Sequence, residues 1–150
     1  MTEADSLTPE QATRVADAVE DIETNVSGLR SYQNLSRDEY LSAEYKETRE
    51  AVERKFEKLT AAVVDIAQTI LKAEGIAAPD HRKAAIDGLE TLDILDSTLA
   101  QKLRDAIGFR DVLAHSYGPI VNDDIVYDAL QNSLERYVAF VEAVSEYLGA

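Results

Sequence analysis

Arg110 and His115 carry the most suggestive chemistry in this sequence. A guanidinium can hold a phosphate, and an imidazole moves protons near neutral pH. Leu103, Ile107 and Leu113 lie three or seven residues from Arg110, so they share its face of a predicted helix. An arginine inside an apolar stripe needs an anionic partner, and either a buried carboxylate or a bound phosphate satisfies that need.

His115 follows Arg110 by five residues, which would point the two side chains about 140° apart on an unbroken helix. Gly118 and Pro119 predict that this helix ends just after His115. The imidazole can then turn back toward the guanidinium, and a helix C-terminus favours a protonated histidine. The alternative is a histidine that caps the helix and does no chemistry.

The segment from Leu99 to Val121 is slightly basic in a very acidic chain. It carries Lys102, Arg104 and Arg110 against two aspartates, whereas the whole chain has 15 basic and 29 acidic residues and a net charge of −14. Such acidity is typical of a protein that avoids polyanions, or of one from a salt-rich cytoplasm where screening removes the repulsion. We expect salt adaptation, since acidic residues occur in nearly every segment.

Five points in the chain have the residue types of a helix N-cap, whose side chain accepts hydrogen bonds from first-turn amides. The predicted caps are Thr8, Ser36, Asp80, Asp96 or Ser97, and Asn122. Thr8 and Ser36 are each followed three residues later by Gln or Glu, which makes each a capping box. The sequence therefore predicts helices that begin at five points.

The spacing of apolar residues predicts the fold class. Apolar residues step by three and four through three long stretches, and no stretch alternates for long enough to predict a strand. We expect an all-α antiparallel bundle of four main helices and one short helix, forming a single domain over residues 1–150. The second helix, Arg37 to Glu74, would be about 55 Å long, so it must bend near Tyr45–Glu50 or project toward a partner subunit. The stripe from Val126 to Leu148 predicts one final helix.

Several classes of site are excluded or disfavoured by composition. The chain has no cysteine, which excludes disulfides and thiolate metal sites. Neither His81 nor His115 has a glutamate three residues before it, as di-metal carboxylate bundles require, so we expect no metal and no cofactor. His81 is expected to be an exposed surface histidine. The longest apolar run is far too short to cross a bilayer, and the acidic N-terminus is unlike a targeting peptide, so we expect a cytoplasmic protein.

Arg110, His115 and Tyr117 together resemble a known motif. Arg-x4-His-x-Tyr in a penultimate helix, before Gly-Pro and a final helix, is similar to the motif of the HepT-type toxins of the HEPN superfamily. The resemblance implies a metal-independent endoribonuclease that acts as the toxin of a type II toxin–antitoxin pair. It also implies a homodimer in which the two motifs face a shared cleft.

The resemblance assigns a role to each motif residue. Arg110 holds the RNA phosphate and stabilises charge in the transition state, and His115 transfers the proton. Asp111 orients one of these two groups, although the family has a small polar residue, often asparagine, at this position. Tyr117 contacts phosphate. We expect Lys102 and Arg104, from the same locally basic segment, to add RNA phosphate contacts.

The resemblance also implies a partner protein. An MNT-type nucleotidyltransferase acts as antitoxin by adding AMP to the motif tyrosine, here Tyr117, so that bulk and charge block the RNA cleft. Two alternatives stay open: a non-catalytic HEPN module that binds a nucleotidyltransferase, and a structural helical dimer in which Arg110 forms only a buried ion pair. We expect Tyr127, Tyr137 and Tyr147 to be packing residues.

Overall fold

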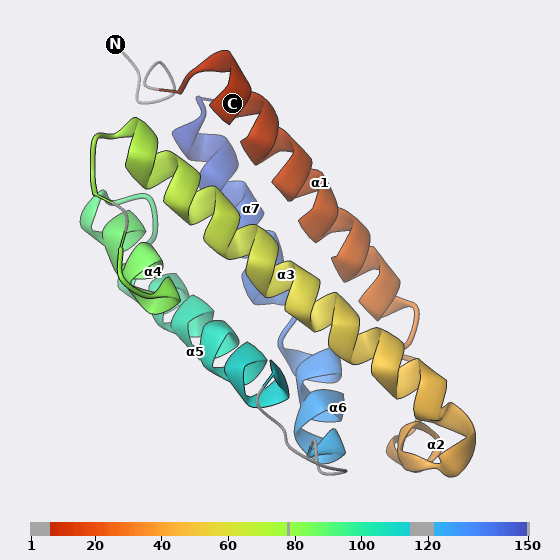
Figure 1. Ribbon diagram of the computed structural model, residues 1–150. Coiled ribbons are helices and arrows are strands. Elements are labelled where there is room, and N and C mark those ends of the chain that lie inside the picture. The colour runs from red at the N-terminus through yellow and green to blue at the C-terminus, as the bar shows by residue number, and fades with distance from the viewer. Residues whose placement is uncertain (1–6, 78, 115–121, 150) are drawn as a thin grey trace.

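The chain folds into α-helices throughout the part that the structure, a computed structural model, describes (Figure 1). The described residues are 7–77, 79–114 and 122–149. The elements are α1 (Pro9–Arg30), α2 (Arg37–Leu41), the 3-10 helix η2 (Ala43–Tyr45), α3 (Lys46–Ala73), α4 (Arg82–Thr91), α5 (Ser97–Ala114), α6 (Asp123–Asn132) and α7 (Glu135–Tyr147). The all-α prediction is confirmed. The count of four main helices and one short one is wrong, because two of the predicted helices are broken.

α3 is the central helix of the bundle. α1 packs along one side of it, α4 and α5 lie on the opposite side, and α7 also contacts it (Figure 1). The buried face of α3 follows the predicted steps of three and four: Val52, Phe56, Leu59, Val63, Ile66 and Ile70. Burying each large apolar side chain contributes roughly 1.5–3 kcal/mol. Within the described ranges, no helix is long and apolar enough to span a membrane.

Four of the five predicted N-caps are confirmed. Thr8, Ser36, Asp96 and Asn122 each accept a hydrogen bond from the backbone amide three residues later. α4 differs, because its cap is His81 and not the predicted Asp80. His81 Nδ1 accepts from the Ala84 amide at 3.2 Å, which requires the neutral imidazole with its proton on Nε2. His81 is exposed, as expected.

The predicted second helix breaks at Ser42. The backbone of Ser42 is extended, with φ −73° and ψ 157°, so α2 ends there and η2 leads into α3. Arg49 holds the break, since its Nη1 donates to the carbonyl oxygens of Tyr40 at 2.7 Å and Ser42 at 2.6 Å. The Ser42 carbonyl also accepts from the Tyr45 amide at 3.1 Å, and the guanidinium joins it to the Tyr40 carbonyl across the break. α3 itself has 28 residues, or about 42 Å, so the expectation of one helix from Arg37 is wrong.

The predicted final helix is also two helices, α6 and α7. At Ser133 the backbone leaves the helical region, with φ −120° and ψ 13°. Asn132 and Ser133 have poor helix propensity because their side chains compete for backbone hydrogen bonds. The apolar stripe still runs through the break, since Leu130, Leu134 and Tyr137 are all buried. The periodicity therefore concealed the break.

Two glycines fix how α4 meets the end of α3. Gly75 has φ +77° and follows the end of α3, with the Ile76 amide donating to the Leu71 carbonyl at 2.9 Å. Gly88 lies against the side chain of Leu71, where a Cβ would come within 2.7 Å of Leu71 Cδ2. A glycine at this point allows α4 to pack closely on α3.

Candidate active site

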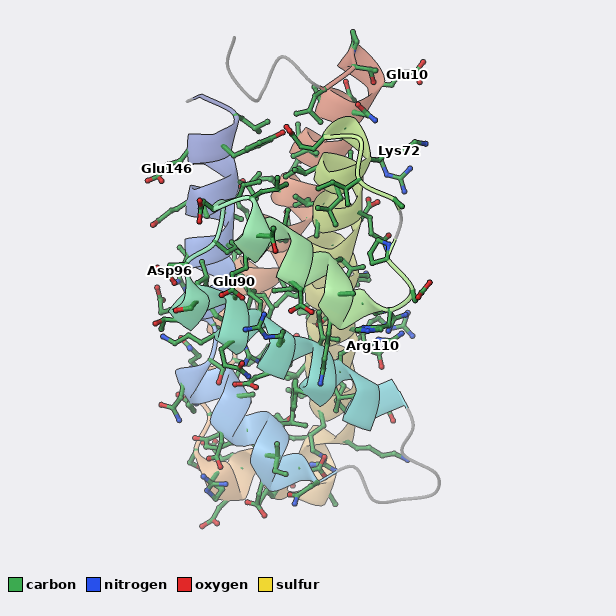
Figure 2. The ribbon with its side chains drawn as sticks, turned by 90° about the vertical axis from the view of Figure 1, so that its left-hand side faces the viewer. Glu10, Lys72, Glu90, Asp96, Arg110 and Glu146 are labelled. Carbon is green, nitrogen blue, oxygen red and sulfur yellow. The ribbon has the colours of Figure 1, made fainter. Side chains whose placement is uncertain are left out.

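Arg110 lies near the C-terminal end of α5, at the margin of the core. Its neighbours on the same helix face, Leu103, Ile107 and Leu113, are buried, so the predicted apolar stripe is confirmed. Arg110 itself is half-buried. Figure 2 shows its side chain at the flank of the bundle, toward the start of α4. The arginine therefore lies at the boundary between the core and the surface.

The other motif residues fall on unplaced parts of the chain. His115 and Tyr117 lie outside the described residues, and the side chain of Asp111 is also outside them. Their predicted roles therefore stay predictions. The structure does describe both flanks of the segment, from α5 up to Ala114 and from Asn122 into α6. The positioning of these two helices decides where the motif segment begins and ends.

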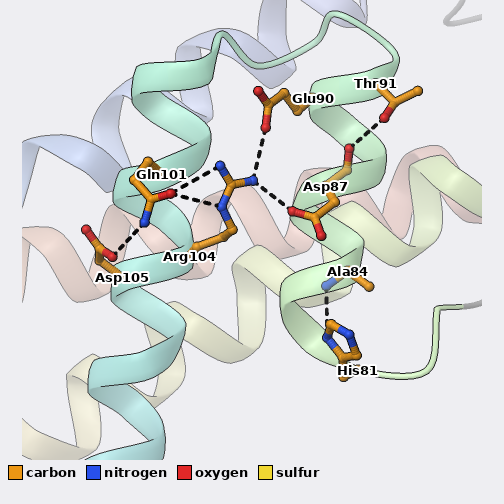
Figure 3. Close-up of polar contacts among 8 residues, drawn as sticks. All are labelled: His81, Ala84, Asp87, Glu90, Thr91, Gln101, Arg104 and Asp105. Atoms are coloured by element: carbon orange, nitrogen blue, oxygen red, sulfur yellow. Dashed lines mark hydrogen bonds and ion pairs between the residues drawn. The ribbon is translucent and has the colours of Figure 1, made fainter.

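α5 is fastened to α4 by Arg104 (Figure 3). The guanidinium Nη1 lies 2.8 Å from Asp87 Oδ1 and 3.0 Å from Glu90 Oε1, and Nε and Nη2 both approach Gln101 Oε1 at 3.4 Å. Gln101 in turn donates to Asp105 Oδ1 at 3.0 Å. The hydrogen bond to Glu90 is the main reason that the pKa of Arg104 is raised above its ordinary value. This arrangement stabilises α5 against α4 one and a half turns before Arg110.

The predicted RNA contacts at Arg104 and Lys102 stay predictions. The donors of Arg104 already meet Asp87, Glu90 and Gln101, so a phosphate would have to displace carboxylates. The geometry thus favours a bracing role for Arg104. Lys102 is exposed and lies on the side of α5 that faces α7, where its carbonyl accepts from Arg136. It is eight residues from Arg110, about 12 Å along the helix.

The end of α5 is also fixed against α3 by an aromatic pair. The rings of Phe109 and Phe56 meet edge to face, with centroids 5.3 Å apart and an interplanar angle of 85°. Phe56 is fully buried, and Phe109 packs against the core. Edge-to-face pairs add about 0.5–1.5 kcal/mol beyond burial. Phe109 therefore anchors the helix immediately beside Arg110.

Arg37 and Tyr127 hold α6, the helix that follows the motif segment in the sequence. The Tyr127 hydroxyl donates to the Leu35 carbonyl at 2.7 Å, and the Arg37 guanidinium lies over the Tyr127 ring at 4.8 Å. Arg37 also pairs with Asp124 at 2.7 Å and Asp128 at 2.5 Å. These contacts fix the first turn of α6, which follows the motif segment directly.

A partly buried polar cluster lies under the start of α6. Burial, followed by the nearby carboxylates of Asp123 and Glu50, raises the pKa of the Glu53 carboxyl. Arg49 opposes this rise and lies 3.6 Å from Asp123. Burial also raises the pKa of Tyr40, whose hydroxyl has no hydrogen-bond partner in the described part of the chain. Burial of these ionisable groups costs electrostatic free energy, and the cluster lies where α6 begins, directly after the motif segment in the sequence.

The three tyrosines near the C-terminus pack as predicted. Tyr137 is fully buried, Tyr147 is nearly so and bonds to Glu74 Oε1 at 2.6 Å, and Tyr127 is partly buried. Among the residues that the structure describes, no three histidine, aspartate or glutamate side chains gather as a metal site requires.

The first turn of α4 adds basic residues that the motif analysis did not select. His81, Arg82 and Lys83 follow one another in the sequence and line a surface cavity together with Ile107 of α5. The run of His, Arg and Lys in a chain of net charge −14 was the available signal. Its position beside the motif helix depends on the packing of α4 on α5, which the sequence does not give.

Comparison with known protein families matches most of the chain to one of them. The family described as "Ribonuclease HepT-like" matches residues 22–144. A protein named tRNA nuclease HepT, from Aphanizomenon flos-aquae (strain 2012/KM1/D3), is 31% identical over 121 residues, which covers 80% of each chain. A protein named mRNA nuclease HepT, from Shewanella oneidensis, is 25% identical over 83 residues, covering 55% of this chain and 62% of that protein.

Solved structures show the same fold at low sequence identity. A toxin–antitoxin crystal structure with AMP-PNP superposes with a TM-score of 0.80 at 16% identity, covering 89% of this chain and 98% of that one. A tri-AMPylated HEPN toxin of Shewanella oneidensis, in complex with an MNT antitoxin, gives a TM-score of 0.76 at 18% identity, covering 89% and 97%. The fold is therefore that of HEPN toxins.

Proposed function

Because this chain belongs to the HepT-like ribonuclease family, we propose that it is the toxin of a toxin–antitoxin pair and cuts RNA at Arg110 and His115. The observation that carries the proposal is the position of Arg110. Arg110 is half-buried near the end of α5, a helix held against α4 by Arg104 and against α3 by Phe109. It lies within residues 22–144, which match the family, and a histidine follows it five residues later. The relatives named as tRNA and mRNA nucleases support RNA as the substrate class.

The proposed reaction uses the RNA as its own nucleophile. The 2′-hydroxyl oxygen attacks the adjacent phosphorus, the bond to the 5′-oxygen breaks, and the products are a 2′,3′-cyclic phosphate and a 5′-hydroxyl. His115 moves a proton, either by taking it from the 2′-hydroxyl or by giving one to the leaving oxygen. Arg110 holds the phosphate and stabilises the charge that develops on its oxygens. Asp111 orients one of these groups.

We place the reaction in a homodimer whose two motifs share one cleft. An arginine at the margin of a core, near the end of its helix, is suited to such a cleft because a second subunit can cover its apolar side. Light scattering should give a dimer at micromolar concentration, and a monomer under all salt conditions would contradict this part of the proposal.

The partner that this proposal implies is an MNT-type nucleotidyltransferase. The Tyr117 hydroxyl oxygen would attack the α-phosphorus of ATP, pyrophosphate would leave, and the phenolic proton would pass to solvent. The added phosphate would pair with Arg110 and occupy the place of the RNA phosphate. Structural relatives in complex with an MNT antitoxin, one of them AMPylated, support this proposal. Tyr127 lies inside α6 with its hydroxyl bonded to Leu35, so it is a poor acceptor of AMP.

Cleavage of a labelled tRNA by purified variants tests the catalytic assignment. Arg110→Ala should lose about 10²–10³-fold in rate, and His115→Ala about 10²–10⁴-fold. Arg54→Ala, at an exposed arginine of α3, is the matched control and should cut at the wild-type rate. Circular dichroism must show an unchanged helical content. Wild-type activity in either motif variant would contradict the assignment, and an inactive wild type would favour the non-catalytic module.

Co-expression with the nucleotidyltransferase tests Tyr117. Intact mass and peptide mapping should find one or more AMP groups on Tyr117 and none on Tyr127. Tyr117→Phe should keep much of the RNA cleavage and escape neutralisation. A neutralised complex with unmodified Tyr117 would instead show that the antitoxin blocks the site by simple contact.

A further inference from the structure

We propose that the first turn of α4 forms a second phosphate-binding subsite for the RNA strand, next to the phosphate that Arg110 holds. The subsite consists of His81, Arg82 and Lys83, here called the α4 basic cluster. Nothing in the motif Arg-x4-His-x-Tyr includes these residues. The inference rests on the proposed ribonuclease function and adds to it a substrate contact outside the motif.

The α4 basic cluster faces the motif helix. Its three side chains line a cavity of about 450 Å³ with Ile107 of α5. Arg110 lies one turn beyond Ile107 on the same helix face, and Figure 2 shows its side chain toward the start of α4. The cluster and the motif arginine are thus parts of one surface that two helices build together.

The side chain of Lys83 on α4 lies close to Gly108 of α5. The Lys83 ammonium lies 3.5 Å from the place that a Cβ on Gly108 would occupy. A Cβ at this position would lie in ordinary van der Waals contact with the Lys83 side chain. The ammonium therefore lies beside α5, at a position two residues before Arg110.

The charge of the cluster is unusual for this protein. Five arginines elsewhere pair with carboxylates: Arg14, Arg30, Arg37, Arg49 and Arg104. Lys83, in contrast, is exposed and has no carboxylate partner among the described residues. His81 presents its Nε2 proton as a further donor, since its Nδ1 is used in capping. In a protein with a net charge of −14, the donors of Lys83 and His81 thus lie beside the helix that carries Arg110.

Three carboxylates of α4 and α5 are bound away from the cluster. Asp87 and Glu90 are bound by Arg104 on the side away from the first turn of α4, and Asp105 accepts from Gln101 (Figure 3). Asp80, just before the cluster, is the remaining exposed carboxylate of this segment. Arg104 thus binds two carboxylates of α4, while Arg82 and Lys83 bring two formal positive charges to the first turn.

RNA is the polyanion that this surface fits, because successive phosphates of a strand are regularly spaced and each is neutralised by one cation. Every such contact releases condensed counterions, so it adds to the salt dependence of binding. Losing one lysine or arginine contact to phosphate should lower the slope of log affinity against log salt by about one.

The test measures binding of a labelled tRNA by fluorescence anisotropy between 50 and 300 mM KCl. All proteins carry His115→Ala, so that the RNA is bound and not cut. The test variant is Arg82→Gln with Lys83→Gln. The control is Arg54→Gln with Lys58→Gln, which removes the same charge from exposed positions on α3; Lys58 lies on the side of α3 that faces α1.

The test variant should lower the slope by about two and weaken binding roughly tenfold at 150 mM salt, whereas the control should stay within twofold. Lys83→Gln alone should lower the slope of log affinity against log salt by about one. This single variant replaces the double variant in the test if the double variant does not fold. Equal binding of test and control overturns the subsite and leaves the ribonuclease assignment standing. The subsite is also overturned if the test variant loses nucleotidyltransferase binding and keeps RNA binding. A wild type that neither binds nor cuts RNA overturns the proposed function itself.

Discussion

Arg49→Met should destabilise the fold much more than removal of any surface arginine. The Arg49 side chain is only 15% exposed, and its Nη1 donates to two carbonyl oxygens at the break between α2 and α3. Methionine fills a similar volume and offers no donor. The substitution therefore isolates the hydrogen bonds from the packing of the side chain.

The size of the effect follows from the two hydrogen bonds. Bonds from a charged donor contribute about 1.5–3 kcal/mol each. The Ser42 carbonyl keeps the Tyr45 amide as a partner, so we take the lower end and expect a loss of about 3 kcal/mol in the free energy of unfolding. For a chain of this size, that loss lowers Tm by roughly 6–12 °C. The change also removes the positive charge of Arg49 from beside Glu53 and Asp123.

Urea unfolding followed by circular dichroism measures this loss, with Arg14→Met as the matched control. Arg14 pairs with Asp65 at 2.8 Å, but its side chain is 66% exposed, so its removal should cost under about 1 kcal/mol. Both variants lose one positive charge, so the global repulsion changes equally. Equal stability of the two variants would refute the view that Arg49 holds the break.

Three further predictions concern packing, pH and salt. Gly88→Ala should lower the free energy of unfolding by about 1 kcal/mol, measured in thermal melts. Overpacking against Leu71 costs about 1–3 kcal/mol, and the better helix propensity of alanine offsets at most about 1 kcal/mol of this. A variant more stable than the wild type would contradict the close contact between Gly88 and Leu71. Burial and neighbouring carboxylates raise the pKa of Glu53, so the folded state holds its proton more tightly than the unfolded chain, and stability from this group is lost as pH rises through the folded pKa. Glu53→Gln should therefore be more stable than the wild type at pH 7. When the pH is lowered from 7 to 5, the variant should gain less stability than the wild type, and an equal gain in both proteins would contradict this. Tm should rise with KCl from 0.1 to 2 M because screening relieves the net charge of −14, whereas a flat curve would contradict salt adaptation.

Local signals in the sequence were sufficient for four helix starts and for most of the core. A cap such as Ser36 acts on amides three residues away, and a stripe such as that of α3 needs only its own spacing. The apolar face around Arg110 was predicted in the same way, because its residues lie one or two turns along a single helix.

Tertiary contacts decided what the sequence could not show. The break at Ser42 depends on Arg49, seven residues later, which no propensity indicates. The bracing by Arg104 depends on α4 and α5 lying side by side, so the sequence did not show its contacts with Asp87 and Glu90. The α4 basic cluster was overlooked for the same reason, since only the packing of two helices brings it beside the motif.

The most direct test of the central claim is the end chemistry of RNA cut by the wild-type protein in EDTA. The account predicts fragments with a 2′,3′-cyclic phosphate and a 5′-hydroxyl, formed at the same rate with or without chelator, and no such fragments from His115→Ala. Fragments with a 3′-hydroxyl and a 5′-phosphate, or cleavage that stops in EDTA, would contradict it.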